Sequence, residues 1–198
     1  MKIVVVTPYF YPHIGGAENY AYNIAKGLKE EYNWEIVVIT SNHEEKKYIE
    51  EKIDRIKIYR LPQWFKISNT PVNPMWLFGI HRILIEEQPD IINAHSPVPF
   101  ISDITFLVAG KIPLVITYHS GSMIKQSSIL NPLIALYELL FLPMLFRKSQ
   151  KIICYSPDFM KRNLNIYKAK VNCIAPGPTN LKLISGFICF TIDIASNR

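Results

Sequence analysis

The sequence has few cysteines, few glycine motifs and no long apolar run, and each shortage argues against a class of protein. Its three cysteines, among 198 residues, form no C-x-x-C pair, so we expect no disulfide framework and a reducing compartment. Neither G-x-G-x-x-G nor Gly-Lys-Ser/Thr occurs, which argues against a nicotinamide-dependent enzyme and a P-loop NTPase. The longest apolar stretch, residues 133–146, is shorter than the ~20 residues that a membrane span needs.

Charge is also modest and scattered. Lysine and arginine exceed aspartate and glutamate by 22 to 16, a net charge of +6, without forming a basic cluster, so we expect no nucleic-acid partner. The surplus fits a solvated basic surface, or a protein that meets anionic membranes or phosphorylated substrates. With 49% hydrophobic residues and no secretory signal, we expect a folded cytoplasmic domain, peripheral to the inner face of the membrane if it binds one.

The chain is organised around residues 2–18, KIVVVTPYFYPHIGGAE. The β-branched run predicts a buried strand, and apolar residues at helical spacing begin directly after Gly15 and Gly16. Glycine permits close backbone approach and a helix N-terminus offers N–H groups to an anion, so Gly15 and Gly16 are candidate diphosphate-binding residues. The alternative is that the two glycines only form a tight turn.

Strand and helix patterns alternate along the rest of the chain. Strands are predicted at residues 35–40, 57–61, 91–94, 114–118, 152–155 and 171–175. Four pairs of an N-cap residue followed by proline predict helix starts, at Asn73, Ser96, Asn131 and Ser156. This alternation predicts an α/β fold: a doubly wound, Rossmann-like parallel sheet of about seven strands with helices on both faces.

Four segments allow a more specific expectation. Residues 42–52 are predicted as a loop or short exposed helix, and residues 57–61 as an exposed strand near a sheet edge. Residues 62–71 are predicted as an irregular loop, with Trp64 and Phe65 packed beneath it rather than exposed to a ligand or membrane. The helix of residues 132–148 is apolar around most of its circumference, and we expect it to be buried rather than to face a membrane or partner.

Ligands of such sheets bind beyond the carboxyl ends of the strands. The residues that follow successive strands there include His95, His119, Ser120 and Ser156. His119 is the candidate catalytic residue, because histidine exchanges a proton near neutrality and a small Ser-Gly-Ser turn after it leaves room for a substrate. Alternatively, His119 is a histidine that is hydrogen-bonded at the end of a strand and has no catalytic role. A metal site on His95 and His119 is not expected, since no acidic or thiol ligand accompanies them.

The opening stretch, with Pro8, Tyr9, Pro12, Gly15, Gly16 and Glu18, resembles the start of the GT-B glycosyltransferases of family 4. The segments ending at His95, His119 and Ser156 also match that family's pattern, so the resemblance covers residues 2–178. It implies a Gly-Gly loop near the donor's diphosphate, a histidine at position 119 near the reacting sugar, and a nucleotide-sugar donor with a lipid-linked, saccharide or other hydroxyl acceptor. It implies no metal and no other cofactor.

Domain organisation departs from that family in one respect. Family members carry two glutamates eight positions apart in a second, donor-binding Rossmann-like domain, and no such pair occurs here. We therefore expect residues 1–178 to be the N-terminal, acceptor-side domain and residues 179–198 to be a divergent linker remnant. We expect no turnover without a separate donor-binding domain or subunit. The alternative is a non-catalytic module that binds a phosphate or a partner.

Overall fold

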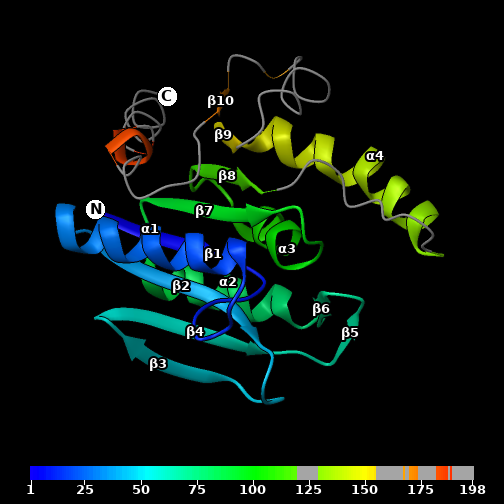
Figure 1. Cartoon of the computed structure of the whole chain (residues 1–198), viewed down its shortest axis with the longest axis horizontal. Helices are drawn as coiled ribbons and strands as arrows, with labels where there is room; N and C mark the ends of the chain where they lie inside the picture. Colours follow the sequence, from blue (N-terminus) through cyan, green and yellow to red (C-terminus); the bar gives the residue numbers. More distant parts are fainter. Residues whose placement is uncertain (120–128, 155–166, 168–169, 174–181, 187, 189–198) are drawn as a thin grey trace.

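The computed structural model describes residues 1–119, 129–154, 167, 170–173, 182–186 and 188, and an eight-stranded sheet forms its centre (Figure 1). The strands are β1 (Lys2–Val6), β2 (Glu35–Asn42), β3 (Ile49–Ile53), β4 (Ile56–Pro62), β7 (Ile91–Ser96), β8 (Leu114–Tyr118), β9 (Lys151–Cys154) and β10 (Val171–Cys173). Their order is β10-β9-β8-β7-β1-β2-β4-β3, and all pairs except β3 with β4 are parallel. Seven parallel strands in this order confirm the predicted doubly wound sheet.

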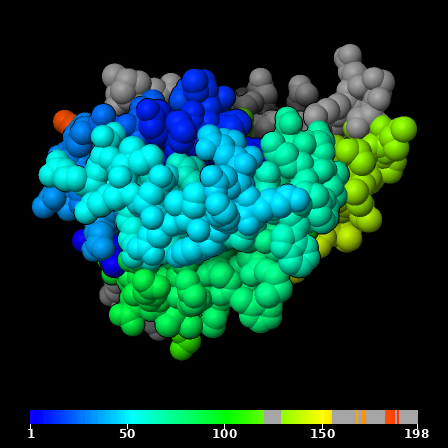
Figure 2. Space-filling model, turned by 90° about the horizontal axis from the view of Figure 1, so that it is seen from below, coloured from blue at the N-terminus to red at the C-terminus, as the bar shows by residue number. Residues whose placement is uncertain are grey.

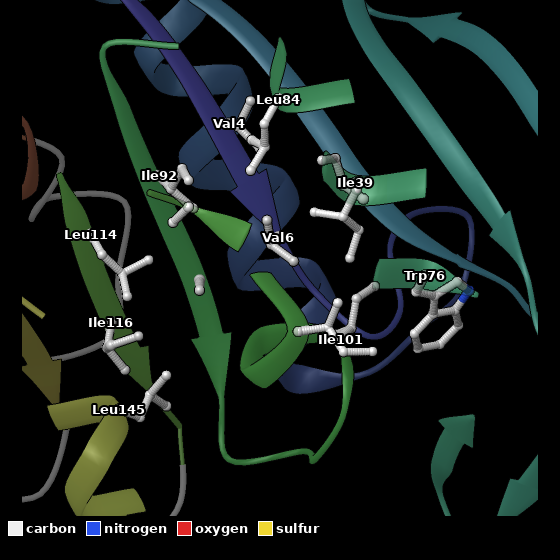
Figure 3. Packing of buried hydrophobic residues seen from close by; sticks show 14 of the residues in the cluster. Val4, Val6, Ile39, Trp76, Leu84, Ile92, Ile101, Leu114, Ile116 and Leu145 are labelled. Atoms are coloured by element: carbon white, nitrogen blue, oxygen red, sulfur yellow. The ribbon is translucent and has the colours of Figure 1, made fainter. Parts of the chain in front are cut away.

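Helices cover both faces of the sheet. They are α1 (Gly16–Tyr32), α2 (Trp76–Glu87), α3 (Ile101–Val108) and α4 (Asn131–Lys148). Alternate residues of the strands point to opposite faces, so Val4 and Val6 lie on the face that carries Trp76, Ile101 and Leu145 of α2, α3 and α4 in one buried cluster (Figure 3). The other face packs against α1 and against Ile184 and Ile188 of the tail. The helices on both faces confirm the prediction.

The segment between β2 and α2 differs from prediction. Residues 49–53 form β3, whose Glu50 and Lys52 are exposed at the sheet edge, and β3 covers β4, which is therefore mostly buried. Residues 62–71 contain most of a hairpin, β5 (Phe65–Ile67) with β6 (Thr70–Val72), instead of an irregular loop. Trp64 and Phe65 are 52% and 51% exposed, so the expectation that they pack beneath the segment is wrong.

Two of the predicted helix starts are shifted. After Asn73 the helix begins at Trp76, with the Asn73 Oδ1 atom accepting the Met75 N–H. After Ser96 it begins only at Ile101, where the Asp103 carboxylate accepts the Phe100 N–H. The start at Asn131 is confirmed, and Ser156 lies outside the described residues.

α4 is exposed, which corrects the expectation that it is buried. Only Leu142, Leu145 and Phe146 are buried in the core, while the rest of the helix extends past the sheet (Figure 1). Its exposed apolar side chains include Leu133, Leu136, Leu139, Leu140, Phe141 and Met144, each between 49% and 71% exposed. Two polar contacts join it to α3: the Tyr137 hydroxyl donates to the Asp103 carboxylate at 3.0 Å, and Lys148 Nζ donates to the Phe106 carbonyl at 2.5 Å. Among the described helices, α4 included, none combines the length and the hydropathy that crossing a bilayer requires.

The amino-terminal edge of the sheet is held by Glu87, which is 6% exposed. Lys57 and Tyr59 donate to its Oε1 atom at 2.8 and 2.5 Å, and Lys2 donates to Oε2 at 3.0 Å. Burial alone would raise the pKa of Glu87, but these hydrogen bonds lower it to about 2. Glu87 therefore remains charged and joins β1 and β4 to the end of α2.

Candidate functional site

Two histidines meet at the carboxyl ends of β7 and β8. His95 lies within β7, paired in register with Thr117, and the His119 N–H donates to the Ser96 carbonyl at 2.9 Å directly after β8. The ring centroids of His95 and His119 are 4.8 Å apart. Parallel pairing of these strands thus brings together two residues that are 24 positions apart in sequence, as predicted for this edge.

A hydrogen-bonded relay assigns the tautomers of both rings. The Asn93 amide nitrogen donates to the Thr117 hydroxyl at 2.9 Å, so its Oδ1 atom is the acceptor facing His95 Nε2, at 2.9 Å. His95 therefore carries its proton on Nε2 and accepts through Nδ1, which lies 2.8 Å from His119 Nε2. By the same logic, neutral His119 carries its proton on Nε2 and has its lone pair on Nδ1.

Burial keeps both rings neutral. Desolvation lowers the pKa of His119 to about 4, and desolvation together with the neighbouring His119 lowers the pKa of His95 well below its ordinary value. A base with so low a pKa takes a proton weakly at neutral pH. The arrangement therefore favours His119 as a group that orients a hydroxyl through a hydrogen bond, rather than as a strong proton acceptor.

The Gly15–Gly16 turn lies on the same rim of the sheet. Tyr20, one helical turn after Gly16, packs its ring edge against His119, with centroids 5.4 Å apart, and lies 6.1 Å from His95. A side chain at position 16 would meet nothing within 4 Å, whereas a Cβ at position 15 would lie 2.2 Å from the Glu18 carboxylate. Only Gly16, then, presents open backbone at the N-terminus of α1.

Glu18 also bears on the predicted diphosphate contact. Its carboxylate folds back over Gly15 in the first turn of α1, where the helix macrodipole favours a negative charge. This carboxylate lies where an incoming phosphate would approach the helix N-terminus. Diphosphate binding by Gly15 and Gly16 stays a prediction that requires the Glu18 side chain to move.

Sequence reasoning missed a second group of side chains at the same edge of the sheet. The sequence predicts His13 and His43 as isolated surface or loop residues, yet their rings pack edge to face with centroids 4.8 Å apart. The available signal was position, since His43 directly follows β2 and the ligand-binding edge collects such residues. His81, the remaining histidine, is exposed on α2.

Two predicted site residues cannot be placed and no metal centre is apparent. Ser120 and Ser156 lie outside the described residues. In the part of the chain that the structure describes, no group of three or more histidine, cysteine, aspartate or glutamate side chains could hold a metal ion.

Comparison with known proteins gives a family and a fold. Residues 14–177 match the profile of Glycosyltransferase Family 4. The chain is 25% identical over 164 residues to an uncharacterized glycosyltransferase of Methanocaldococcus jannaschii, covering 79% of this chain and 42% of that protein. It is 28% identical over 99 residues to one subunit of the human phosphatidylinositol N-acetylglucosaminyltransferase, covering 48% of this chain and 20% of that protein.

Among solved structures, a sucrose-phosphate synthase structure from Thermosynechococcus elongatus superposes with a TM-score of 0.63 at 13% identity, over 98% of both chains. At that identity the likeness shows the fold alone: one Rossmann-like half of a GT-B arrangement. The chain spans less than half the length of the two curated relatives that it matches.

Proposed function

Because the chain belongs to glycosyltransferase family 4, we propose that it is the acceptor-side domain of an enzyme that transfers a sugar from a nucleotide-sugar donor to a hydroxyl group. The observation that carries the proposal is the family match over residues 14–177 combined with the histidine pair at the carboxyl edge of the sheet. His95 is 1% exposed and His119 is half-buried at the carboxyl edge of the sheet. Their hydrogen bond contributes little to a core that apolar residues already fill, so His119 is better explained as a group that faces a substrate and is oriented by His95.

His119 is the proposed contact to the reacting centre. Its Nε2 proton is held by His95, which fixes the orientation of the ring at the carboxyl edge of the sheet. A ring held in one orientation can align a sugar or acceptor hydroxyl for reaction. Gly16 is the proposed contact to the donor's diphosphate, through its open backbone at the start of α1.

Sugar transfer needs donor and acceptor in one cleft from which water is excluded. The described residues form one Rossmann-like sheet, which supplies one wall of such a cleft. We therefore expect that transfer requires a second, donor-binding domain or subunit, and that the 198 residues alone do not turn over.

The acceptor is proposed to be lipid-linked and presented at a membrane surface. The exposed apolar face of α4 ends in Arg147 and Lys148, and Trp64 and Phe65 project from the hairpin segment. Figure 2 shows the hairpin and α4 toward the same end of the molecule. Apolar side chains with nearby cations suit an anionic bilayer surface, and the name of the human relative includes a phospholipid, phosphatidylinositol.

The test is reconstitution. The purified chain would be mixed with the donor-binding half of the archaeal relative, nucleotide-sugars, and vesicles that contain phosphatidylinositol or polyprenyl phosphate. We expect transfer only in the mixture, and a loss of about 100-fold or more in His119→Ala, the scale of a lost acid–base or orienting group. His81→Ala, on the exposed side of α2, is the matched control.

Three outcomes would contradict the proposal. Transfer by the chain alone would show that no donor domain is needed. Unchanged transfer by His119→Ala would remove the histidine from the reaction. Phosphate binding without any transfer in the mixture would favour the alternative, a non-catalytic binding module.

A further inference from the structure

A cluster of cationic and aromatic side chains lies at the carboxyl ends of β1, β2 and β4, on the far side of the Gly15–Gly16 turn from His119. We call Tyr9, His13, His43, Arg60 and Lys66 the His13–His43 cluster. The Tyr9 and His13 rings stack with centroids 4.6 Å apart, His43 packs edge-on against both, and Lys66 Nζ lies 5.1 Å from the Tyr9 ring. Four separate segments of the chain thus converge on one place.

Arg60 is the buried cation of this cluster, with 5% of the residue exposed. Its Nε atom donates to Glu51 and its Nη2 atom donates to the Tyr11 carbonyl, which fixes the guanidinium under the β1–α1 loop. Its Nη1 atom is buried without a hydrogen-bond partner among the described residues. A buried guanidinium nitrogen without an acceptor is costly.

Other buried polar atoms of the same region also lack a hydrogen-bond partner among the described residues. Thr40 pairs in register with Arg60, and its hydroxyl has no partner among the residues described. The Nδ1 atoms of His13 and His43 likewise lack hydrogen bonds within that part of the chain. Several unsatisfied polar atoms gathered at a ligand-binding edge, the Arg60 guanidinium among them, indicate that an acceptor-rich group belongs there.

Carboxylates accompany the cations of the cluster. Glu51 is engaged by Arg60, Glu18 approaches His13 only to 3.8 Å, and Glu44, 3.8 Å from His43, is 70% exposed. Burial and then the fields of His13, Arg60 and Lys66 lower the pKa of His43, against the opposing effect of Glu44. An anion would offset these fields and allow the His43 imidazole to take up a proton.

We propose that the His13–His43 cluster binds an oxyanion of the acceptor, a phosphate or carboxylate group, with Arg60 as its main ligand. The inference rests on the proposed function and names the acceptor class: a molecule that is itself anionic. The Nη1 atom of Arg60, which has no hydrogen-bond partner among the described residues, can donate to such a group, and Lys66 adds a second cation on the exposed side.

The position of the cluster also determines how far the acceptor's charged group lies from the hydroxyl that receives the sugar. From β2, which His43 follows, to β8, which His119 follows, the sheet order requires three steps between neighbouring strands. At about 4.8 Å per step His43 and His119 are about 14 Å apart, and Arg60, in β4, lies one strand further away. The acceptor's charged group is therefore remote from the hydroxyl that receives the sugar.

Histidine NMR on the purified chain tests the proposal. Inorganic phosphate, and acetate in a separate series, would be titrated while the imidazole C–H and ¹⁵N signals are recorded. We expect saturable shifts of His13 and His43, a rise in the pKa of His43 of about one unit, and no response of His81. A stronger response to phosphate assigns a phosphate, and a stronger response to acetate assigns a carboxylate.

Arg60→Gln should weaken phosphate binding about tenfold or more, and Lys66→Ala, an exposed change that leaves the core intact, about threefold. Lys47→Ala, an exposed lysine in the turn after β2, is the matched control and should bind normally. If phosphate shifts all histidines alike, or if Lys66→Ala and Arg60→Gln bind as tightly as the unmodified chain, the proposal fails.

This experiment needs no donor domain, so its failure is separable from failure of the proposed function. In the reconstituted enzyme, Arg60→Gln should raise the KM for an anionic acceptor and leave the KM for the nucleotide-sugar unchanged. Equal transfer to neutral and anionic acceptors would overturn this inference while leaving the transferase function standing.

Discussion

Replacing Asn93 by aspartate tests whether the relay from Asn93 to His119 is a single coupled unit. Asn93 is 4% exposed, and its Oδ1 atom lies 2.9 Å from His95 Nε2. Aspartate has the same shape and still accepts the proton of His95, while the Thr117 hydroxyl can turn to donate to it. The substitution therefore adds a negative charge at the end of the relay without removing any atom of the two rings.

The expected magnitude follows from the environment of the pair. With a pKa of about 4, roughly one His119 ring in a thousand is protonated at pH 7. A carboxylate at hydrogen-bonding distance raises a histidine pKa by about 1 to 3 units. In Asn93→Asp the His95–His119 pair should therefore take up its first proton between about pH 5 and 7, as a property of the pair rather than of one ring.

The free energy of unfolding should depend on pH through the same histidine pKa values. In the unmodified chain the pKa of His119 is lower in the folded state than in the unfolded state. Acidification from about pH 6.5 to about pH 4 thus protonates the unfolded chain first and removes about 3 kcal/mol. In Asn93→Asp the folded-state pKa of the pair rises, so less stability is lost over this pH range.

Long-range ¹H–¹⁵N spectra and urea unfolding at pH 4.5 and 7.5 provide the two measurements. Asn19→Asp, which adds the same charge on the exposed side of α1, is the control and should leave the titration of both histidines unchanged. If Asn93→Asp shifts neither histidine, or shifts only His95, the relay does not couple to His119 and the tautomer assignment is wrong.

Two further changes separate structural from functional roles. Gly16→Ala should raise the free energy of unfolding by about 0.5–1 kcal/mol, because alanine favours the helix and meets no neighbour there; transfer in the reconstituted enzyme should fall, and unchanged transfer would mean that no ligand approaches Gly16. Leu139→Gln on α4 should weaken binding to anionic vesicles about fivefold in a flotation assay, the effect of losing about 1 kcal/mol of apolar burial. Ile85→Gln, 60% exposed on α2, should have no effect, and equal losses in both variants would exclude α4 as the contact surface.

The fold and the position of the histidine pair were predictable from sequence because both depend on local patterns. Unbroken β-branched runs such as residues 3–6 indicated buried parallel strands, and parallel strands place the residues that follow them at one edge. His95 and His119 therefore came together as predicted. The hydrogen bonds that assign their tautomers depend on Asn93, which sits inside a strand and carried no motif.

The errors share a different cause, which is tertiary context. β3 is a charged segment that becomes a strand only because β4 offers it an open edge, and its presence then buries β4. α4 is apolar on most sides, yet only Leu142, Leu145 and Phe146 are buried, and no pattern within the helix indicates which of its apolar residues other elements will cover. The His13–His43 cluster is assembled from four distant segments, so no motif spacing indicates it, and the position of His43 directly after β2 was the available signal.

The charged strand β3 has a consequence for how this domain can join another protein. Glu50 and Lys52 project from the outermost backbone on that side, and an incoming strand would have to desolvate them to extend the sheet. Growth of the sheet by another chain is thereby discouraged at this border. The companion domain that we propose would instead dock at the rim where the loops, the imidazoles and the double glycine lie, which is also where a shared cavity for two substrates would have to form.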